Sequence, residues 1–280
     1  MDKCQGSGCN AANQSAAGKQ QEAEVRGSLE KIKHKFLVMS GKGGVGKTSV
    51  SVYLAMALAK KGYKVGLMDV DIHGPDVPRM LGLKGMLDLN KQRKLTPISF
   101  SENLTAVSLE SLIPNKDDAI IWRGPMKHQV ILQFISDVEW GELDHLIIDS
   151  PPGTGDEPLS VAQTISDAKA IIVTTPQEIS LADVRKSINF CKTVNIEIFG
   201  IIENMSGFDC PHCGETVDIF GSGGGEKTAA DFNIPFLGKI PFDPKVVSCG
   251  DSGTSYQDTY PDSEVTKAFA AVAEEIAKLV

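Results

Sequence analysis

The sequence has 280 residues, of which 41% are hydrophobic and 23% are charged, and 36 acidic against 28 basic residues give a formal net charge of −8. This length suits one large α/β domain or two small ones. The acidic balance disfavours general attraction to nucleic acid or anionic lipid. No apolar run approaches the roughly 20 residues that span a bilayer, so we expect no membrane segment and no secretion.

The first 32 residues differ in composition from the rest of the chain. They are rich in Gln, Ala, Gly, Ser and Asn and have hardly any large apolar side chain. Such a segment cannot bury enough apolar surface to offset its ordering entropy. We therefore predict a mobile tail over 1–32 that carries Cys4 and Cys9, followed by one domain over 33–280.

Short apolar runs and helical patterns alternate along this domain. Three segments are expected to be helices: 49–61, a segment with helical spacing from Leu181 to Cys191 that begins after Ser180 as its N-cap, and 263–279. The apolar stripe of the last segment indicates a helix that docks on the core. This alternation predicts a mostly parallel central sheet of about seven or eight strands, with helices on both faces. The glycine-rich run at 221–225 is expected to be a flexible loop. Seven runs are predicted strands: 36–39, 64–68, 104–109, 145–149, 170–175, 198–203 and 235–240.

A glycine-rich segment directly follows the first predicted strand. Its sequence, SGKGGVGKTS, matches the phosphate-binding pattern GxxxxGK[ST] between a strand and a helix, which is the context that the pattern requires. Backbone N–H groups converge on phosphate oxygens in such a loop, while the lysine binds phosphate and the threonine hydroxyl binds magnesium. The alternative is a glycine-rich turn with a chance lysine. The predicted nucleotide-binding residues here are Gly41, Lys42, Gly43, Gly44, Val45, Gly46, Lys47, Thr48 and Ser49.

Acidic residues follow two other apolar strands. Asp149 ends the run HLIID, at the position of the carboxylate that assists magnesium binding in phosphate-loop proteins, and Asp69 and Asp71 end another. Carboxylates at strand ends can also serve only as turn formers. Beside a phosphate-binding loop, we predict that they handle magnesium and water.

A CxxC pair, Cys210 and Cys213, lies in the turn DCPHCGE. Zinc sites and redox motifs use the same spacing. A zinc site normally needs four protein ligands, and His212 between the two thiols makes a closed tetrahedral site hard to build. Two such pairs in a dimer would provide the four thiolates that a [4Fe–4S] cluster takes. From the motif alone, zinc, cluster and simple turn all stay open. The six cysteines are too sparse for a disulfide framework, so we expect a reducing, cytoplasmic compartment.

The motifs together resemble a known family. The loop has the form KGGVGKT, and the strings DVDIHGPDVPRMLG, WRGPM, IIDSPPGTGD, IENMSGFDCPHCG, FGSGGG and GKIPFDP follow in order. They resemble the Mrp (ApbC) family of ATP-dependent iron–sulfur cluster carriers, within the MinD- and ParA-like P-loop NTPases with a deviant Walker A motif. The resemblance covers about residues 33–280 and implies a MinD-like fold.

The resemblance also implies roles for particular residues. Lys42 would reach the partner's phosphates across a nucleotide-sandwich homodimer, Lys47 would bind phosphate, and Asp71 would position the attacking water. Asp149 and Thr48 would hold magnesium. Asn204 would read the adenine edge beside the loop from Pro241 to Asp243.

The cofactors and partners follow from the same resemblance. It implies ATP, Mg²⁺ and a labile [4Fe–4S] cluster held by Cys210 and Cys213, with apo iron–sulfur proteins as acceptors. Neither nucleic acid nor a membrane is expected as a partner. The alternatives are a MinD- or ParA-type positioning ATPase and a nucleotide-dependent regulatory scaffold without a cluster.

The sequence departs from the family pattern at two places. Asp76 stands where relatives commonly have serine, and its charge either weakens nucleotide affinity or faces solvent. Some relatives have four cysteines near the N-terminus, whereas this chain has only Cys4 and Cys9 there. Two thiolates cannot complete a four-ligand cluster, so we expect no independent N-terminal cluster within one chain.

Overall fold

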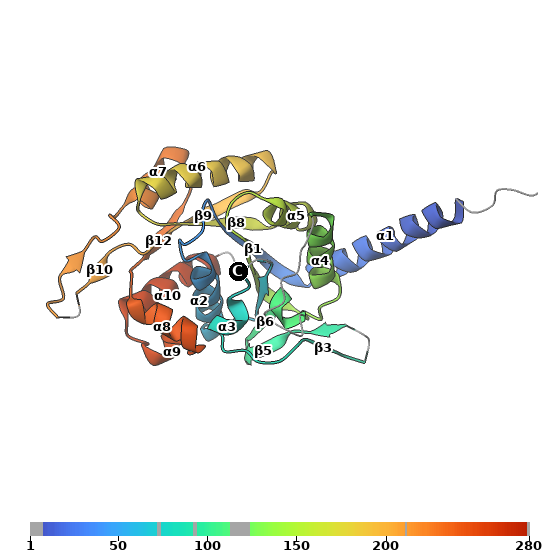
Figure 1. The fold of residues 1–280 in the computed structure, drawn as a ribbon, viewed down its shortest axis with the longest axis horizontal. Helices are drawn as coiled ribbons and strands as arrows, with labels where there is room; N and C mark the ends of the chain where they lie inside the picture. The colour runs from blue at the N-terminus through green and yellow to red at the C-terminus, as the bar shows by residue number, and fades with distance from the viewer. Residues whose placement is uncertain (1–7, 72–73, 92–93, 113–123, 211, 279–280) are drawn as a thin grey trace, which may run out of the picture.

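A computed structural model describes residues 8–71, 74–91, 94–112, 124–210 and 212–278 (Figure 1). Eight strands form one sheet in the order β12-β9-β8-β1-β7-β2-β6-β5, and every neighbouring pair is parallel except β5–β6. The predicted parallel α/β architecture is confirmed. The strands are β1 (Ile32–Ser40), β2 (Val65–Asp69), β5 (Ile98–Ser101), β6 (Leu104–Ser108), β7 (Leu143–Asp149), β8 (Lys169–Thr174), β9 (Glu197–Asn204) and β12 (Phe236–Ile240).

All seven predicted apolar runs form strands of this sheet. The eighth strand, β5, escaped prediction because it is a four-residue edge strand whose side chains alternate between half-buried and exposed. Two short hairpins lie outside the sheet, β3–β4 (Asp88–Leu89 and Leu95–Thr96) and β10–β11 (Phe208–Asp209 and Thr216–Val217).

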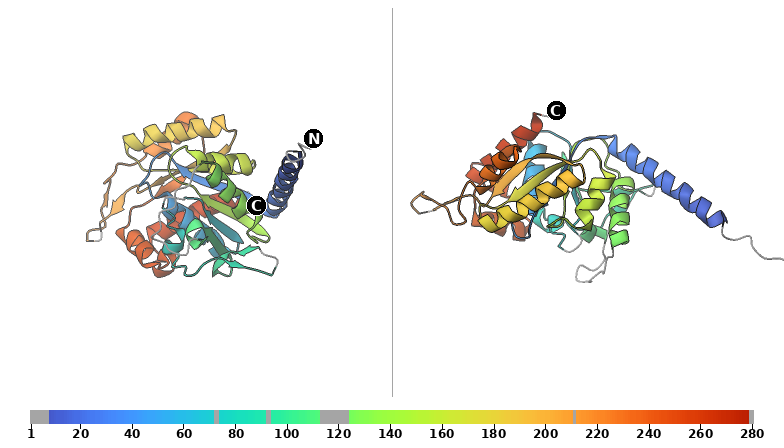
Figure 2. Two further views of the ribbon diagram at one scale, coloured as in Figure 1. Left: turned by 45° about the vertical axis from the view of Figure 1, so that its right-hand side comes forward. Right: turned by 90° about the horizontal axis from the view of Figure 1, so that it is seen from above.

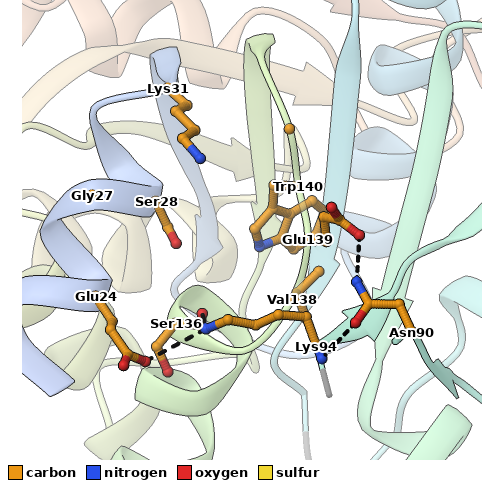
Figure 3. A pocket seen from close by; sticks show the side chains of 11 residues that line it. Glu24, Gly27, Ser28, Lys31, Asn90, Lys94, Ser136, Val138, Glu139 and Trp140 are labelled. Carbon is orange, nitrogen blue, oxygen red and sulfur yellow. Dashed lines mark hydrogen bonds and ion pairs between the residues drawn. The ribbon is translucent and has the colours of Figure 1, made fainter. Parts of the chain in front are cut away.

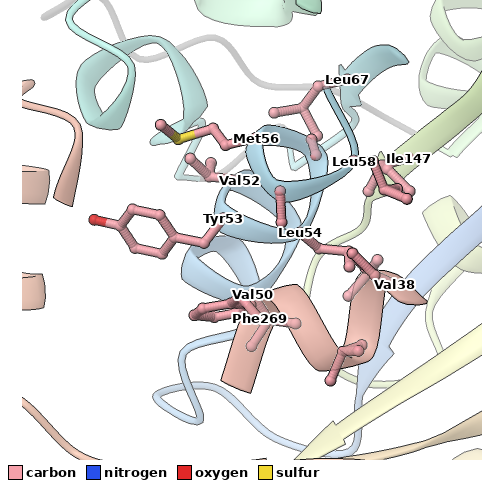
Figure 4. Packing of buried hydrophobic residues seen from close by; sticks show 14 of the residues in the cluster. Val38, Val50, Val52, Tyr53, Leu54, Met56, Leu58, Leu67, Ile147 and Phe269 are labelled. Carbon is pink, nitrogen blue, oxygen red and sulfur yellow. The ribbon is translucent and has the colours of Figure 1, made fainter. Parts of the chain in front are cut away.

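On one face of the sheet, several helices pack around the helix that follows β1. This helix, α2, is buried from Val50 to Ala59, as expected for a helix that is apolar on all sides. It packs between the sheet and α10, where Phe269 lies against it (Figure 4). The apolar stripe of α10 is buried there, so its predicted docking on the core is confirmed. The helices of this face are α2 (Lys47–Lys60), α3 (Val77–Met80), α8 (Pro244–Ser252), α9 (Tyr256–Thr259) and α10 (Glu264–Ala277).

The opposite face carries a second apolar cluster beneath other helices. The cap predicted for one of them is wrong by three residues, because α6 begins at Glu178 with Gln177, and not Ser180, at its N-cap position. The Ser180 hydroxyl instead shares a hydrogen bond of 2.7 Å with the Thr175 hydroxyl. The helices on this side are α4 (Gly124–Ser136), α5 (Asp156–Thr164), α6 (Glu178–Thr193) and α7 (Gly224–Phe232), and the short helix η1 (Leu109–Leu112) follows β6.

The segment expected as a mobile tail is helical in the structure from residue 8. Helix α1 (Gly8–Leu29) projects from the body at its N-terminal end, while its last turns lie on the domain (Figure 2). The side chain of Val25 is buried and Leu29 packs beside it, which the count of apolar residues in the tail overlooked. Lys94 binds Glu24 of α1 and the Ser136 carbonyl oxygen (Figure 3). Cys4 lies outside the described residues.

Membrane insertion has no candidate among the described helices, none of which is long and apolar enough to cross a bilayer.

A buried histidine at the opposite end of β7 from Asp149 makes the fold sensitive to acid. The ring of His145 is fully buried between His34 and Tyr63, with centroids 5.5 and 5.1 Å away, and neither ring nitrogen has a hydrogen-bond partner among the described residues. Burial, assisted by the neighbouring His34, lowers the pKa of His145 to about 4. The folded state therefore keeps this ring neutral.

We expect the free energy of unfolding to decrease as the pH falls from about 6.5 towards about 4, because only the unfolded state then protonates this imidazole. The loss from His145 between about pH 7 and about pH 5 is about 2 kcal/mol. Urea unfolding at both pH values measures it, and His145→Phe should remove this part of the pH dependence. An unchanged pH dependence in the variant would contradict the assignment.

Candidate functional site

The candidate site lies at the edge of the sheet where the parallel strands end. Because parallel strands place their carboxyl ends at one edge, residues that are distant in sequence meet there. The register sets Asp149 of β7 beside both Val38 of β1 and Asp69 of β2. Asn204 ends β9 and pairs with Ile240 of β12 in the same sheet.

The phosphate-binding loop spans the gap between β1 and α2. Gly44 and Gly46 have φ angles of 78° and 75°, a conformation that glycine adopts without strain. Gly46 occupies the N-cap position of α2 without a side-chain cap, which leaves the first backbone N–H groups of the helix for an anion. A side chain at Gly41 would collide with the backbone of Asp183, so this glycine also serves packing against α6.

Asp149 is the centre of a buried polar network beneath this loop. Its Oδ1 atom accepts hydrogen bonds from Lys47 Nζ at 2.7 Å and Ser51 Oγ at 2.6 Å, and its Oδ2 atom accepts from Thr48 Oγ1 at 2.8 Å. The Lys47 and Asp149 side chains are 6% and 1% exposed, so the pair is shielded from water. A hydroxyl and a carboxylate side by side are the oxygen ligands that Mg²⁺ prefers. The sequence prediction missed Ser51, which carries no motif signal.

The two acidic residues of the neighbouring strand end are also buried. Burial, together with the nearby Asp149 charge, raises the pKa of Asp69 well above its usual range. Asp69 accepts hydrogen bonds from the backbone N–H of Asp71 and the Ser108 hydroxyl, so it shapes the turn. Asp71, in contrast, lines an open cavity together with Pro151 and Pro152, the residues that follow β7.

This cavity contains an ion pair that no motif indicated. Lys127 of α4 binds Glu157 of α5 at 2.7 Å, and both side chains are largely buried.

Asp76, the departure from the family pattern, occupies the N-cap position of α3 with an exposed side chain. Neighbouring atoms that shield its carboxyl group from water raise the pKa of Asp76, while Arg79 opposes that shift. Its charge thus faces solvent, one of the two expected outcomes.

A second cavity lies beside the start of α2, and it is called the base pocket here after the role that the family resemblance implies for Asn204. Five of the predicted nucleotide-binding residues line it together, although they come from three distant segments. The side-chain amide of Asn204 donates to the Val45 carbonyl oxygen at 2.9 Å, which ties β9 to the phosphate-binding loop. The five residues are Gly46, Ser49, Asn204, Pro241 and Asp243.

The CxxC pair lies at the tip of the β10–β11 hairpin, which extends from the body at the end opposite α1 (Figures 1 and 2). Cys213 is exposed and Cys210 is half-buried. Backbone N–H groups of His212 and Cys213 hydrogen-bond to the Cys210 sulfur and lower the pKa of this thiol. Such a thiol is more readily a thiolate and hence a metal ligand.

The structure does not join every predicted residue into one centre. The cysteine pair is separate from the phosphate-binding loop, and no group of three or more His, Cys, Asp or Glu in the described part of the chain is placed to hold a metal ion. Lys42 is half-buried and has no ion-pair partner among the described residues. The run at 221–225, expected to be a flexible loop, instead leads into α7, because the buried Glu203 carboxylate accepts the N–H groups of Gly223 and Gly225.

The family profile described as "ParA: NUBPL iron-transfer P-loop NTPase" matches residues 31–277. The chain belongs to this family. It is 48% identical to the "Iron-sulfur cluster carrier protein" of Methanocaldococcus jannaschii, over 93% of this chain and 90% of the relative. It is equally identical to the "Cytosolic Fe-S cluster assembly factor CFD1" of Kluyveromyces lactis, over 91% of this chain and 95% of that protein. The family resemblance predicted from the motifs is confirmed.

Solved structures of relatives agree with this assignment to the NUBPL-type P-loop NTPases. A nucleotide-binding protein of Archaeoglobus fulgidus, solved in complex with ADP, is 38% identical with a TM-score of 0.73, covering 83% of this chain and 91% of that one. The cell division ATPase MinD of Pyrococcus furiosus is 25% identical with a TM-score of 0.64, covering 88% and 99%. The predicted MinD-like fold is confirmed.

The buried network makes Asp149 important for the stability of the fold. Asp149→Ala leaves the Lys47 ammonium buried without its counter-charge, so we expect the free energy of unfolding of the nucleotide-free protein to fall by roughly 3 kcal/mol. Glu197→Ala removes one partner of the surface pair with Lys169 and should cost less than about 1 kcal/mol. Chemical denaturation of both variants tests this, and equal losses would contradict it.

Proposed function

We propose that this chain binds and hydrolyses ATP and carries a labile [4Fe–4S] cluster between two copies of itself, for transfer to apo iron–sulfur proteins. Its place is the cytoplasm, without nucleic acid or a membrane as partner. The relatives named as cluster carriers and assembly factors support the cargo, and the P-loop family supports nucleotide hydrolysis.

The observation that carries this proposal is the incomplete metal site on the hairpin. Cys210 and Cys213 present two sulfur ligands at an exposed tip, and the described residues place no third ligand of the metal-binding kinds beside them. A [4Fe–4S] cluster takes four thiolates, which two hairpins of a dimer supply. A site with two ligands from each chain is accessible to an acceptor, because each hairpin can withdraw with its own pair.

The nucleotide site has residues for each part of phosphoryl transfer. Lys47 neutralises phosphate charge, and the N–H groups at the start of α2 bind phosphate oxygens. Thr48 and Asp149 would hold Mg²⁺, which supplies charge neutralisation on the phosphates when it is bound. Asp71 faces the open cavity beside this network and would orient the attacking water. Asn204, with Pro241 and Asp243, would bind the base.

A homodimer would also complete the nucleotide site. Lys42 lies on the phosphate-binding loop without an ion-pair partner among the described residues, so its charge is available to a second chain. A cation donated across the interface would stabilise negative charge on the transferred phosphoryl group, as an arginine finger does. Hydrolysis would then require two chains.

Two substitutions should separate the two activities. Lys47→Ala should reduce ATP turnover by roughly 100-fold or more, because the phosphate charge loses its cation. The cysteine pair should still load a cluster, because it lies on a hairpin separate from the phosphate-binding loop. Cys210→Ser should lose the cluster and continue to hydrolyse ATP. Phosphate release and iron content measure the two properties, and normal hydrolysis by Lys47→Ala would refute the assigned phosphate site.

The decisive experiment is anaerobic reconstitution with iron and sulfide. We expect one cubane per dimer in the wild type and none in the Cys210→Ser, Cys213→Ser double variant, as determined by iron, sulfide and zinc analysis and by absorption. Transfer to an apo-protein would then be measured directly. Zinc, or no metal, in the wild type would refute the proposed cargo.

A further inference from the structure

Both ends of the cysteine-bearing segment meet at one aromatic side chain. This segment, called the cysteine hairpin here, runs from Ser206 to Phe220. The ring centroid of Phe242 lies 6.0 Å from that of Phe208 at the entry and 6.0 Å from that of Phe220 at the exit. The Phe242 N–H also donates to the Gly207 carbonyl oxygen at 2.8 Å. Phe242 therefore fixes the base of the hairpin from both sides.

The same residue belongs to the wall of the nucleotide site. Phe242 lines the base pocket together with Asn204 and its chain neighbour Pro241. Phe242 also lines a neighbouring cavity together with Phe208 and Cys210. The segment around Phe242 is thus shared by the base pocket and the cysteine hairpin.

A second anchor lies next to Asn204. Glu203 is fully buried, and its carboxylate accepts hydrogen bonds from the Ser206 hydroxyl at the start of the hairpin and from the N–H of Gly223, which follows its end, at 2.9 Å. Asn204 directly follows this glutamate in β9 and bonds to the phosphate-binding loop. The entry to the hairpin is therefore connected to nucleotide-binding residues through both β9 and Phe242.

The rest of the hairpin has few anchors of its own. Val217 and Ile219 are 48% and 51% exposed, and Cys213 at the tip is also exposed. The orientation of the thiols therefore depends mainly on the contacts at the base of the hairpin. A change that displaces or immobilises Phe242 is transmitted to both cysteines.

We propose that Phe242 is a positioning residue that couples occupancy of the base pocket to the orientation and mobility of the cysteine hairpin. A base packed against Pro241 and Asp243 restrains Phe242, and the two ring contacts carry this restraint to Phe208 and Phe220. The inference rests on the proposed function, in which this coupling would let the nucleotide state control how firmly the cluster is held. Coupling of binding is reciprocal, so cluster loading changes nucleotide affinity by the same factor.

Hydrogen–deuterium exchange of the full cluster-free chain, with and without Mg²⁺ and ADP, tests the coupling directly. In the wild type, the amides of the phosphate-binding loop and of the hairpin should both exchange at least about threefold more slowly with nucleotide. Phe220→Ala should keep the protection of the phosphate-binding loop and lose that of the hairpin, because Phe220 does not line the base pocket. Phe242→Ala should also lose the response of the hairpin.

Phe199→Ala is the matched control. This half-buried ring lies near the other end of β9 and pairs with Phe36 at 5.2 Å, far along the strand from the hairpin. The control should therefore keep the full nucleotide response of the hairpin. The inference is overturned if wild-type hairpin amides do not respond while the phosphate-binding loop does, or if the Phe220 and Phe242 variants respond like the wild type.

A second readout uses the reconstituted cluster and an iron chelator. Nucleotide should slow cluster loss from the wild type by about fivefold, and Phe220→Ala should reduce this difference to less than about twofold. Equal loss rates with and without nucleotide in the wild type would overturn the inference. A wild type that binds no iron or sulfide would instead refute the proposed cargo, and the exchange experiment would still decide whether the coupling exists.

Discussion

The buried ion pair between Lys47 and Asp149 is the interaction on which the site depends. It ties the phosphate-binding loop to β7, and Thr48 and Ser51 share the same carboxylate. Without nucleotide, each charge compensates the other in a place where an isolated charge would be costly. In the proposed function, phosphate would pair with the lysine and magnesium with the carboxylate, so binding would exchange one set of neutralised charges for another.

The order of strands distributes the tasks along the edge of the sheet. The phosphate-binding loop follows β1, and the acidic residues end the neighbouring strands β7 and β2. Strands β9 and β12, farther along the sheet, provide residues of the base pocket and the connection to the hairpin (Figure 1). In the proposed function, a nucleotide lying from the phosphate-binding loop to the base pocket would therefore reach from the acidic strand ends towards the base of the cysteine hairpin. The fold places cargo and chemistry apart and joins them through β9 and the loop after β12.

Features that depend on residues close in sequence could be predicted, whereas contacts between residues distant in sequence could not. Apolar runs and the pattern of the phosphate-binding loop involve residues that are close in sequence. They were therefore sufficient to predict seven strands of the sheet and the fold class. Glu203, buried beneath the glycine-rich run, showed no signal because its partners Gly223 and Gly225 are distant in sequence and meet it only in the folded chain. The docking of α1 depends on two apolar residues whose burial is set by α4 and its neighbours. Composition averages over such single contacts.

The cysteine hairpin combines a thiol that is readily deprotonated with an exposed tip. Backbone N–H groups lower the pKa of the Cys210 thiol, so deprotonation for metal binding costs less there, while the exposed tip gives an acceptor direct access to the sulfur atoms. Two ligands per chain cannot enclose a cluster, so in the proposed dimer the geometry between the two hairpins would decide how firmly the cluster is held. Because the tip has few contacts, that geometry is set at the base of each hairpin, where Phe242 and Glu203 lie beside the nucleotide site. Under the proposed coupling, control of cargo release through the nucleotide would therefore need only small movements at this base.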